Sequence, residues 1–184
     1  RCRPKAYTGV DICADSVREA TERHISLLKS GKIQTPAQFH CLDASTDALP
    51  CESEGVDVCS MQFSMQFLFA TESTVEHSLR EIGRVTAPGG IFAAVLPDGD
   101  RVSFEMTRTV APSAVLGHFL FRKFEKTMEA LRQNDPPVGI PYTFSLNAGP
   151  ACMEYVVSPS FLEERLREQG FEGALPGGIF SANA

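Results

Sequence analysis

The stretch that decides the fold lies at residues 56–100 and reads VDVCSMQFSMQFLFATESTVEHSLREIGRVTAPGGIFAAVLPDGD. It begins with an apolar run that predicts a buried strand, and a second apolar run at 91–100 predicts another. Between them, apolar residues recur at helical spacing, namely Val75, Leu79, Ile82 and Val85. The Pro-Gly-Gly turn at 88–90 ends this helix. A helix between two continuously apolar strands predicts a parallel sheet covered on both faces.

The same order of elements precedes this stretch. Residues 6–13 (AYTGVDIC) predict a strand that ends at Asp11, and residues 37–45 (AQFHCLDAS) predict a second strand that ends at Asp43. Strands that alternate with helices in this way indicate an α/β fold.

The residues between these two strands predict an amphipathic helix. Its apolar face consists of Val17, Ala20, Leu28 and either Ile25 or His24. Asp15 or Ser16 is placed to cap the start of this helix, and Gly31 is placed to end it.

The last third of the chain follows a different pattern. Residues 100–110 predict a helix, and the alternating segments 119–126 and 142–147 predict strands. A final helix is expected at 160–171, whereas the tail at 172–184 carries no clear element.

Composition places the chain among ordinary globular proteins. It has 184 residues, which is long enough for a sizeable core. Hydrophobic residues make up 43% of the chain and charged residues 22%, as is usual for a globular protein. The net charge of −6 argues against coating of nucleic acid but permits binding of one nucleic-acid end in a local basic cleft. No apolar run approaches the ~18 residues that a membrane span needs, so no membrane association is expected.

The cysteines show no metal-binding or redox spacing. They are Cys2, Cys13, Cys41, Cys51, Cys59 and Cys152. We expect them to be reduced, buried and inert in an intracellular protein.

The predicted strands end in polar residues. In an open parallel sheet, ligands bind beyond the carboxyl ends of the strands, which here carry Asp11, Asp43, Gln62 and Asp98. A carboxylate at such an end can accept both hydroxyls of a ribose, and the next one can accept from an adenine amino group. The alternative for each aspartate is that it caps the following helix. For Phe63 and Phe67 the alternatives are plain core or the lining of a site, whereas Phe69 is expected in the core.

Four segments in this order resemble the mRNA cap guanine-N7 methyltransferases. They are YTGVDICADSVREATERH, FHCLDAS, the stretch at 56–100, and YTFSLN followed by CMEYVVSPSFLEERLREQG. The family has Cys-Gln-Phe and then His-Tyr where this chain has MQFSMQF, and its PEYLV is similar to MEYVV here. The resemblance covers residues 6–170. It implies a Rossmann-like class I methyltransferase, with a mostly parallel sheet flanked by helices in a single methyltransferase domain at 1–184.

The resemblance also implies a site for the cosubstrate S-adenosylmethionine. Asp11 with Ile12 would bind its ribose, Asp43 with Ala44 its adenine, and Gln62 its methionine part. No metal is implied.

A second implied site binds the guanine of the cap. Phe63 would pack on the base, while Gln66 stands where the family usually has His and Phe67 where it usually has Tyr. Glu154 would accept from the Watson–Crick edge of the guanine, where two adjacent N–H donors suit one carboxylate.

The implied reaction is methyl transfer to N7 of the guanine in a GpppN cap. Because N7 has a free lone pair, no general base and no other catalytic side chain is expected. Positioning of the reactants alone can contribute about 7–11 kcal/mol. The implied partner is the capped 5′ end of an RNA, in the nucleus or alternatively the cytoplasm, and adjoining capping-enzyme domains or subunits are left open.

One part of the family pattern is absent from residues 1–184, namely a Gly-rich turn of the D-x-G-x-G type. We therefore expect an incomplete domain that lacks its first strand and its last strands and binds the donor weakly or not at all. Two alternatives stay open. One is another class I methyltransferase with a small-molecule or protein substrate, and the other is a pseudo-enzyme module.

Overall fold

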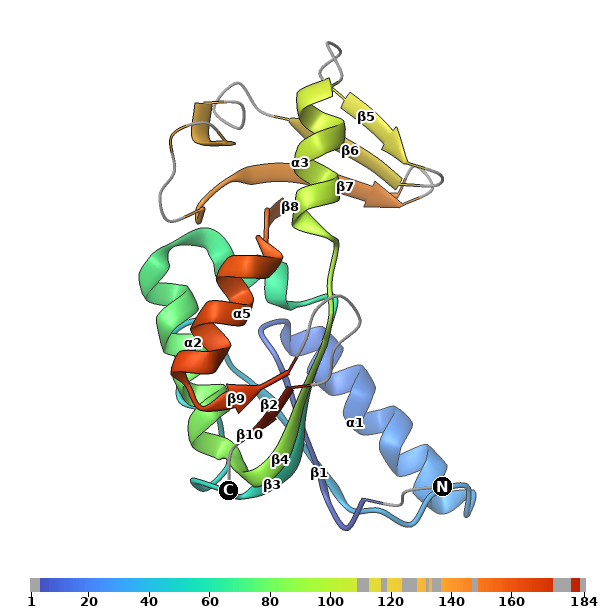
Figure 1. The fold of residues 1–184 in the computed structure, drawn as a ribbon. Coiled ribbons are helices and arrows are strands. Elements are labelled where there is room, and N and C mark those ends of the chain that lie inside the picture. The colour runs from blue at the N-terminus through green and yellow to red at the C-terminus, as the bar shows by residue number, and fades with distance from the viewer. Residues whose placement is uncertain are drawn as a thin grey trace.

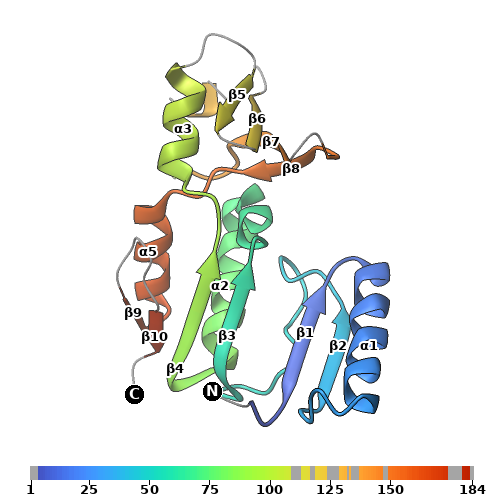
Figure 2. The same cartoon turned by 90° about the vertical axis from the view of Figure 1, so that its right-hand side faces the viewer.

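The computed structural model describes residues 4–108, 113–116, 119–123, 129–131, 133, 137–146, 149–173 and 180–182. Their strands form three sheets, two of which contain parallel pairs. The third sheet is antiparallel and lies at one end of the molecule, beyond the carboxyl ends of the parallel strands (Figures 1 and 2). The α/β architecture expected from the sequence is confirmed.

The first sheet pairs two parallel strands, with one helix packed against them. These elements are β1 (Tyr7–Asp11), α1 (Ala14–Lys29) and β2 (Ala37–Cys41). The half-buried face of α1 includes Val17, Ala20 and His24, whereas Ile25 is 44% exposed, so His24 is the correct one of the two alternatives. The prediction is wrong for Leu28, which is 39% exposed. No residue of α1 is fully buried.

The predicted cap of α1 is wrong. Cys13 is the N-cap residue and makes no side-chain capping hydrogen bond. Instead, Oδ1 of Asp11 accepts the N–H of Cys13 at 2.7 Å, because the chain turns sharply out of β1 into the helix. Gly31 does follow the helix and adopts a positive φ of 67°, as its predicted role requires.

The second sheet contains the stretch at 56–100. Its elements are β3 (Val56–Gln62), the 3₁₀ helix η1 (Met65–Ala70), α2 (Glu72–Val85) and β4 (Thr86–Val95). Strands β3 and β4 are parallel, and their register shifts next to the Pro-Gly-Gly turn. The start of α2 is fixed by a capping box in which Thr71 and Thr74 satisfy each other's backbone N–H.

Two short strands extend this sheet beyond β4. They are β9 (Phe171–Glu172) and β10 (Phe180–Ala182), and β10 pairs antiparallel with both β4 and β9. The expectations that 172–184 carries no element and that the last strands are lacking are therefore wrong. Strands of two or three residues are held by backbone pairing and leave no periodic pattern in the sequence.

The antiparallel sheet has the order β5-β6-β7-β8 and packs against α3 (Figure 2). Its elements are α3 (Gly99–Arg108), β5 (Ser113–Leu116), β6 (Phe119–Lys123), β7 (Pro141–Leu146) and β8 (Cys152–Tyr155). Strand β8 contacts η1, so this sheet adjoins the end of β3.

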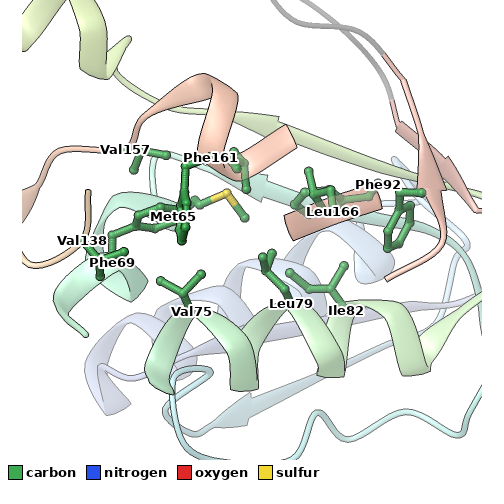
Figure 3. Close-up of a cluster of buried hydrophobic side chains, with 12 residues drawn as sticks. Met65, Phe69, Val75, Leu79, Ile82, Phe92, Val138, Val157, Phe161 and Leu166 are labelled. Carbon is green, nitrogen blue, oxygen red and sulfur yellow. The ribbon is translucent and has the colours of Figure 1, made fainter. Parts of the chain in front are cut away.

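The main core lies between α2, α5 (Pro159–Glu168) and β4, with η1 closing one end (Figure 3). The apolar face predicted for α2 is confirmed, since all four of its members are buried. Phe69 is 1% exposed and packs edge-on against Phe161, which confirms its expected place in the core.

The expectation of buried cysteines is wrong for the described ones. They are unpaired, as expected, but Cys13, Cys41 and Cys152 are exposed, and Cys51 and Cys59 are half-buried. Cys2 lies outside the described residues. None of the helices in the described ranges is long and apolar enough to cross a membrane.

Candidate functional site

The carboxyl ends of β1 and β2 bring Asp11 and Asp43 onto one edge of their sheet. Asp11 is opposite Cys41 in the register, and the backbone oxygen of Asp11 accepts the N–H of Leu42 at 3.1 Å. Oδ1 of Asp43 accepts the N–H and the hydroxyl of Ser45 at 2.8 and 2.6 Å. Each carboxylate is thus oriented through Oδ1, and no described residue donates a hydrogen bond to Oδ2 of either.

The other strand-end residues lie in different settings. Ile12 is 68% exposed beside Asp11, and the carbonyl of Ala44 accepts the hydroxyl of Ser78 at 2.9 Å. Asp98 accepts the N–H of Arg101 at 3.1 Å, so the alternative of a helix cap holds for this aspartate.

Gln62 is separated from these residues by the sheet arrangement. It lies on β3, which shares no hydrogen-bonded ladder with β1 in the part of the chain that the structure describes. Its side chain donates to the hydroxyl of Ser60 at 2.8 Å. Four of the five predicted donor-site residues therefore lie at the edge of the β1–β2 sheet, and no hydrogen bond among the described residues joins Gln62 to them.

Phe63 and Phe67 are not core residues. They are 61% and 44% exposed, which contradicts the alternative of plain packing. Phe63 also has a φ of 52°, a conformation that costs energy for a large side chain. Its N–H donates to the carbonyl of Val95 at 2.7 Å, which holds the turn at the end of β3 in place.

Gln66 lies beneath this turn and is 2% exposed. Its Nε2 donates to the carbonyl of Phe63 at 3.0 Å and to Oε1 of Glu154 at 3.4 Å. Because both partners can only accept, the amide nitrogen must face them. Oε1 of Gln66 is consequently turned away, and it is buried without a hydrogen bond among the described residues.

Glu154 completes this cluster from β8. It is 4% exposed, and its Oε2 accepts the hydroxyl of Tyr142 at 2.7 Å. Burial, and then the hydrogen bond to Glu154, raise the pKa of Tyr142 far above its ordinary value, so the phenol stays a donor.

Tyr142 belongs to this cluster, although the sequence pattern does not predict it. The β7–β8 register places it directly opposite Glu154. The alternating pattern of YTFSLN predicts a strand, but nothing in that pattern specifies the register with the next strand.

Within the described residues, no group of three or more His, Cys, Asp or Glu side chains could hold a metal ion. The structure thus shows two clusters: a strand-end pair of carboxylates with open oxygens, and a buried Gln66–Glu154–Tyr142 group beside an exposed aromatic ring.

Comparison with solved structures shows the same fold in methyltransferases. An S-adenosylmethionine-dependent methyltransferase from Clostridium acetobutylicum matches with a TM-score of 0.60 and 8% identity, over 98% of this chain and 76% of that one. One from Methanosarcina mazei matches with a TM-score of 0.58 and 16% identity, over 96% of this chain and 81% of that one. The expected class I methyltransferase fold is confirmed by these similarities.

Comparison with curated sequences is more specific. The mRNA cap guanine-N(7) methyltransferase 1 of Oryza sativa subsp. japonica is 28% identical over 89% of this chain and 46% of its own length. The mRNA cap guanine-N(7) methyltransferase of Schizosaccharomyces pombe is 28% identical over 82% of this chain and 42% of its own length. The chain spans about half the length of the curated relatives it matches.

A family model provides the assignment. The model described as the mRNA (guanine-N(7))-methyltransferase domain matches residues 2–172, nearly the whole chain. The chain therefore belongs to the mRNA (guanine-N(7))-methyltransferase domain family.

Proposed function

We propose that this chain supplies the donor and guanine sites of an enzyme that transfers a methyl group from S-adenosylmethionine to N7 of the mRNA cap guanine. Family membership supports the reaction class. The observation that carries the choice of substrate is the buried Gln66–Glu154–Tyr142 group beside Phe63.

The acceptors of this group match the donors of guanine. The Watson–Crick edge of guanine offers one ring N–H and an amino group, and each carboxylate oxygen of Glu154 can accept a further hydrogen bond. The unpartnered Oε1 of Gln66 adds another acceptor. A buried acceptor without a partner costs free energy, and a ligand N–H would remove that cost.

The exposed rings suit the flat face of the base. Phe63 and Phe67 present large apolar surfaces at the end of β3, adjacent to the buried group. Stacking of a base on an aromatic ring contributes about 1–3 kcal/mol. The φ strain at Phe63 fits a residue that is held ready for a ligand.

The residues at the ends of β1 and β2 fit a nucleoside. We assign Asp11 with Ile12 to the ribose of the donor and Asp43 with Ala44 to its adenine, because the Oδ2 atoms of both carboxylates remain available as acceptors. Gln62, at the end of β3, is assigned to the methionine part of the donor.

The reaction requires the protein mainly to position the methyl donor and the guanine N7. The N7 lone pair forms a bond to the methyl carbon while the carbon–sulfur bond breaks, and the electron pair stays on sulfur to give S-adenosylhomocysteine. No proton moves, so a general base is not needed. The carboxylates of Asp11, Asp43 and Glu154 suit both the cationic donor and the cationic methylated guanine.

The proposal also includes the domain, the RNA substrate and the cellular compartment of the reaction. We propose that residues 1–184 form part of one methyltransferase domain whose substrate is the capped 5′ end of an RNA in the nucleus. The rival functions are a methyltransferase for a small molecule or a protein, and a module that binds no donor.

The test is a titration of this chain with GTP and with inosine triphosphate, which lacks the 2-amino group. We expect GTP to bind more tightly, and we expect Glu154→Gln and Phe63→Ala each to weaken GTP binding by about tenfold or more. Glu164→Gln and Phe104→Ala are matched controls, because they alter an exposed acid and an exposed ring elsewhere.

Equal affinity for the two nucleotides would contradict the assignment of the guanine edge. Unchanged GTP affinity in both Glu154→Gln and Phe63→Ala would overturn the cap-guanine proposal and favour a methyltransferase for a small molecule or a protein. Methyl transfer from the donor to a GpppG dinucleotide, by this chain or by one extended to the length of its curated relatives, would exclude the module that binds no donor.

A further inference from the structure

The segment at 42–55 joins β2 to β3 without a helix or strand of its own. It carries Asp43 and Ala44 at its start. Its backbone is held along α2 by Ser78, Glu81 and Arg84, which are three residues apart, and by the neighbouring His77.

Arg84 and Glu81 hold the far half of this segment together. Arg84 donates through Nη1 to the carbonyl of Cys51 and through Nη2 to the carbonyl of Leu49, both at 2.9 Å. Oε2 of Glu81 accepts the N–H of Leu49 at 2.9 Å. The N–H of Leu49 is thus bound by Glu81 and its carbonyl by Arg84.

The two side chains are also bound to each other. Nη2 of Arg84 lies 2.7 Å from Oε2 of Glu81, whose side chain is 10% exposed, and Nε donates to Oε1 at 2.9 Å. The Arg84 guanidinium holds the pKa of Glu81 below its ordinary value, which keeps the carboxylate ionised. This ion pair is only partly buried, since the Arg84 side chain is 30% exposed. Such a pair is weak support for stability as such, because desolvation offsets the attraction, but it can specify one geometry.

Ser78 and His77 hold the near half of the segment. The hydroxyl of Ser78 lies 2.9 Å from the carbonyl of Ala44 and 2.7 Å from the carbonyl of Thr74, so the two acceptors share its one proton. Nε2 of His77 lies 3.1 Å from the carbonyl oxygen of Asp47. A carbonyl only accepts, so Nε2 carries the proton, and Nδ1 accepts from Arg80 at 3.2 Å.

Asp43 is next to the anchored Ala44 and is hydrogen-bonded to the anchored Asp47. Its N–H donates to Oδ2 of Asp47 at 2.9 Å, and its carbonyl accepts the N–H of Asp47 at 2.8 Å. A shift of either Ala44 or Asp47 would therefore move the Asp43 carboxylate.

We propose that Ser78, Glu81 and Arg84 are positioning residues, which hold segment 42–55 so that the Asp43 carboxylate faces the adenine of the methyl donor. None of the three touches the ligand in this proposal. The inference rests on the proposed function for its ligand, whereas the anchoring of the segment is independent of it.

The experiment measures amide hydrogen exchange in the chain with and without S-adenosylhomocysteine, together with the affinity for this probe. The variants are Ser78→Ala and Glu81→Gln. The matched control is Arg165→Met, which breaks an Arg–Glu pair of the same spacing on α5 that does not contact the segment. The thermal midpoint of every variant is measured in parallel, so that exchange is compared only between folded proteins.

We expect amides of the segment at 43–51 to exchange about tenfold faster in Glu81→Gln, and also faster in Ser78→Ala, with α5 unchanged. The dissociation constant for S-adenosylhomocysteine should rise by about tenfold in Glu81→Gln and stay unchanged in Arg165→Met. If affinity for the probe falls while the exchange of α5 and the thermal midpoint stay unchanged, the residues act by positioning Asp43 and not by stabilising the whole fold.

Three results would overturn the inference. Unchanged exchange of the segment in both variants would disprove the anchoring. Faster exchange with unchanged affinity for the probe would disprove the positioning role. Failure of the unsubstituted chain to bind the probe at millimolar concentration, both alone and in a chain extended to the length of its curated relatives, would overturn the donor site of the proposed function. It would also overturn the ligand named here, while the exchange rates would still decide the anchoring.

Discussion

Tyr142 and Glu154 face each other across β7 and β8, and the hydroxyl of Tyr142 donates to Oε2 of Glu154 at 2.7 Å. Both residues are buried, so this hydrogen bond is shielded from water. Gln66 reaches the other carboxylate oxygen from η1. The antiparallel sheet thus contributes both Tyr142 and Glu154 to this group, and its third member, Gln66, comes from η1.

The first prediction concerns this hydrogen bond. Tyr142→Phe should lower the free energy of unfolding by about 1–3 kcal/mol, because it removes a donor from a buried carboxylate. It should also weaken GTP binding, since Glu154 loses its fixed orientation. Denaturant unfolding and GTP titration measure the two effects. Tyr155→Phe, on the same strand as Glu154, is the control, and equal losses in both variants would contradict the specific role of Tyr142.

A second prediction concerns acid. Because the pKa of Glu81 is lowered from its ordinary value of 4.5, the carboxylate stabilises the fold above that pH, and the contribution is lost as the pH falls through the lower folded-state value. Unfolding free energies of the unsubstituted chain and Glu81→Gln should therefore differ at neutral pH and converge below pH 4.5. A difference that stays constant across this range would refute the role of the ionised carboxylate.

The third prediction tests the junction between β4 and α3. A Cβ at Gly99 would lie 2.6 Å from the carbonyl carbon of Val157, so Gly99→Ala should cost about 1–3 kcal/mol or more. Gly83→Ala is the matched variant, because its Cβ would meet only Gln169 at 3.4 Å within a helix. It should be neutral or stabilising by up to about 1 kcal/mol. Thermal unfolding of both variants decides this, and a Gly99→Ala variant as stable as the unsubstituted chain would show the junction to be loose.

The fourth prediction ranks the thiols. Burial raises the pKa of Cys59 to about 11, whereas the nearby backbone N–H and hydroxyl of Ser16 favour the thiolate of the exposed Cys13 and lower its pKa. Iodoacetamide at pH 8 should therefore modify Cys13 first and Cys59 last, because the thiolate is the reactive form. Peptide mass spectrometry over time gives the order, and comparable rates at the two residues would contradict it.

The fifth prediction concerns the core between α2 and α5. Leu166→Ala should cost about 2–5 kcal/mol, since Leu166 is fully buried there. Ile25→Ala on α1 is the control, because Ile25 is substantially exposed and should cost far less. Urea unfolding measures both, and similar midpoints would mean that the two helices do not differ in packing.

The local elements could be predicted from the sequence where a periodic pattern runs over several turns. The apolar face of α2 is an example, since all its predicted members are buried. For α1, in contrast, the pattern allowed either His24 or Ile25, and the contact of His24 with Phe39 on β2 decided between them. The strand β10 escaped prediction because three residues form no pattern.

The candidate site was predictable only in part. Strand ends placed Asp11 and Asp43 correctly side by side, since parallel neighbouring strands end at the same edge. Tyr142 was missed because its partner depends on the register of β7 with β8, and the α2 residues were missed because they act on a distant segment.

By itself, the sequence determined the order and kind of the long elements, the apolar face of α2 and the polar ends of the first strands, because these follow from spacing along the chain. Only the tertiary structure decided that Gln66 and Glu154 meet, that Tyr142 joins them, and that α2 holds the segment carrying Asp43. These contacts join residues far apart in the sequence, and they depend on strand register and helix packing, which no local pattern specifies.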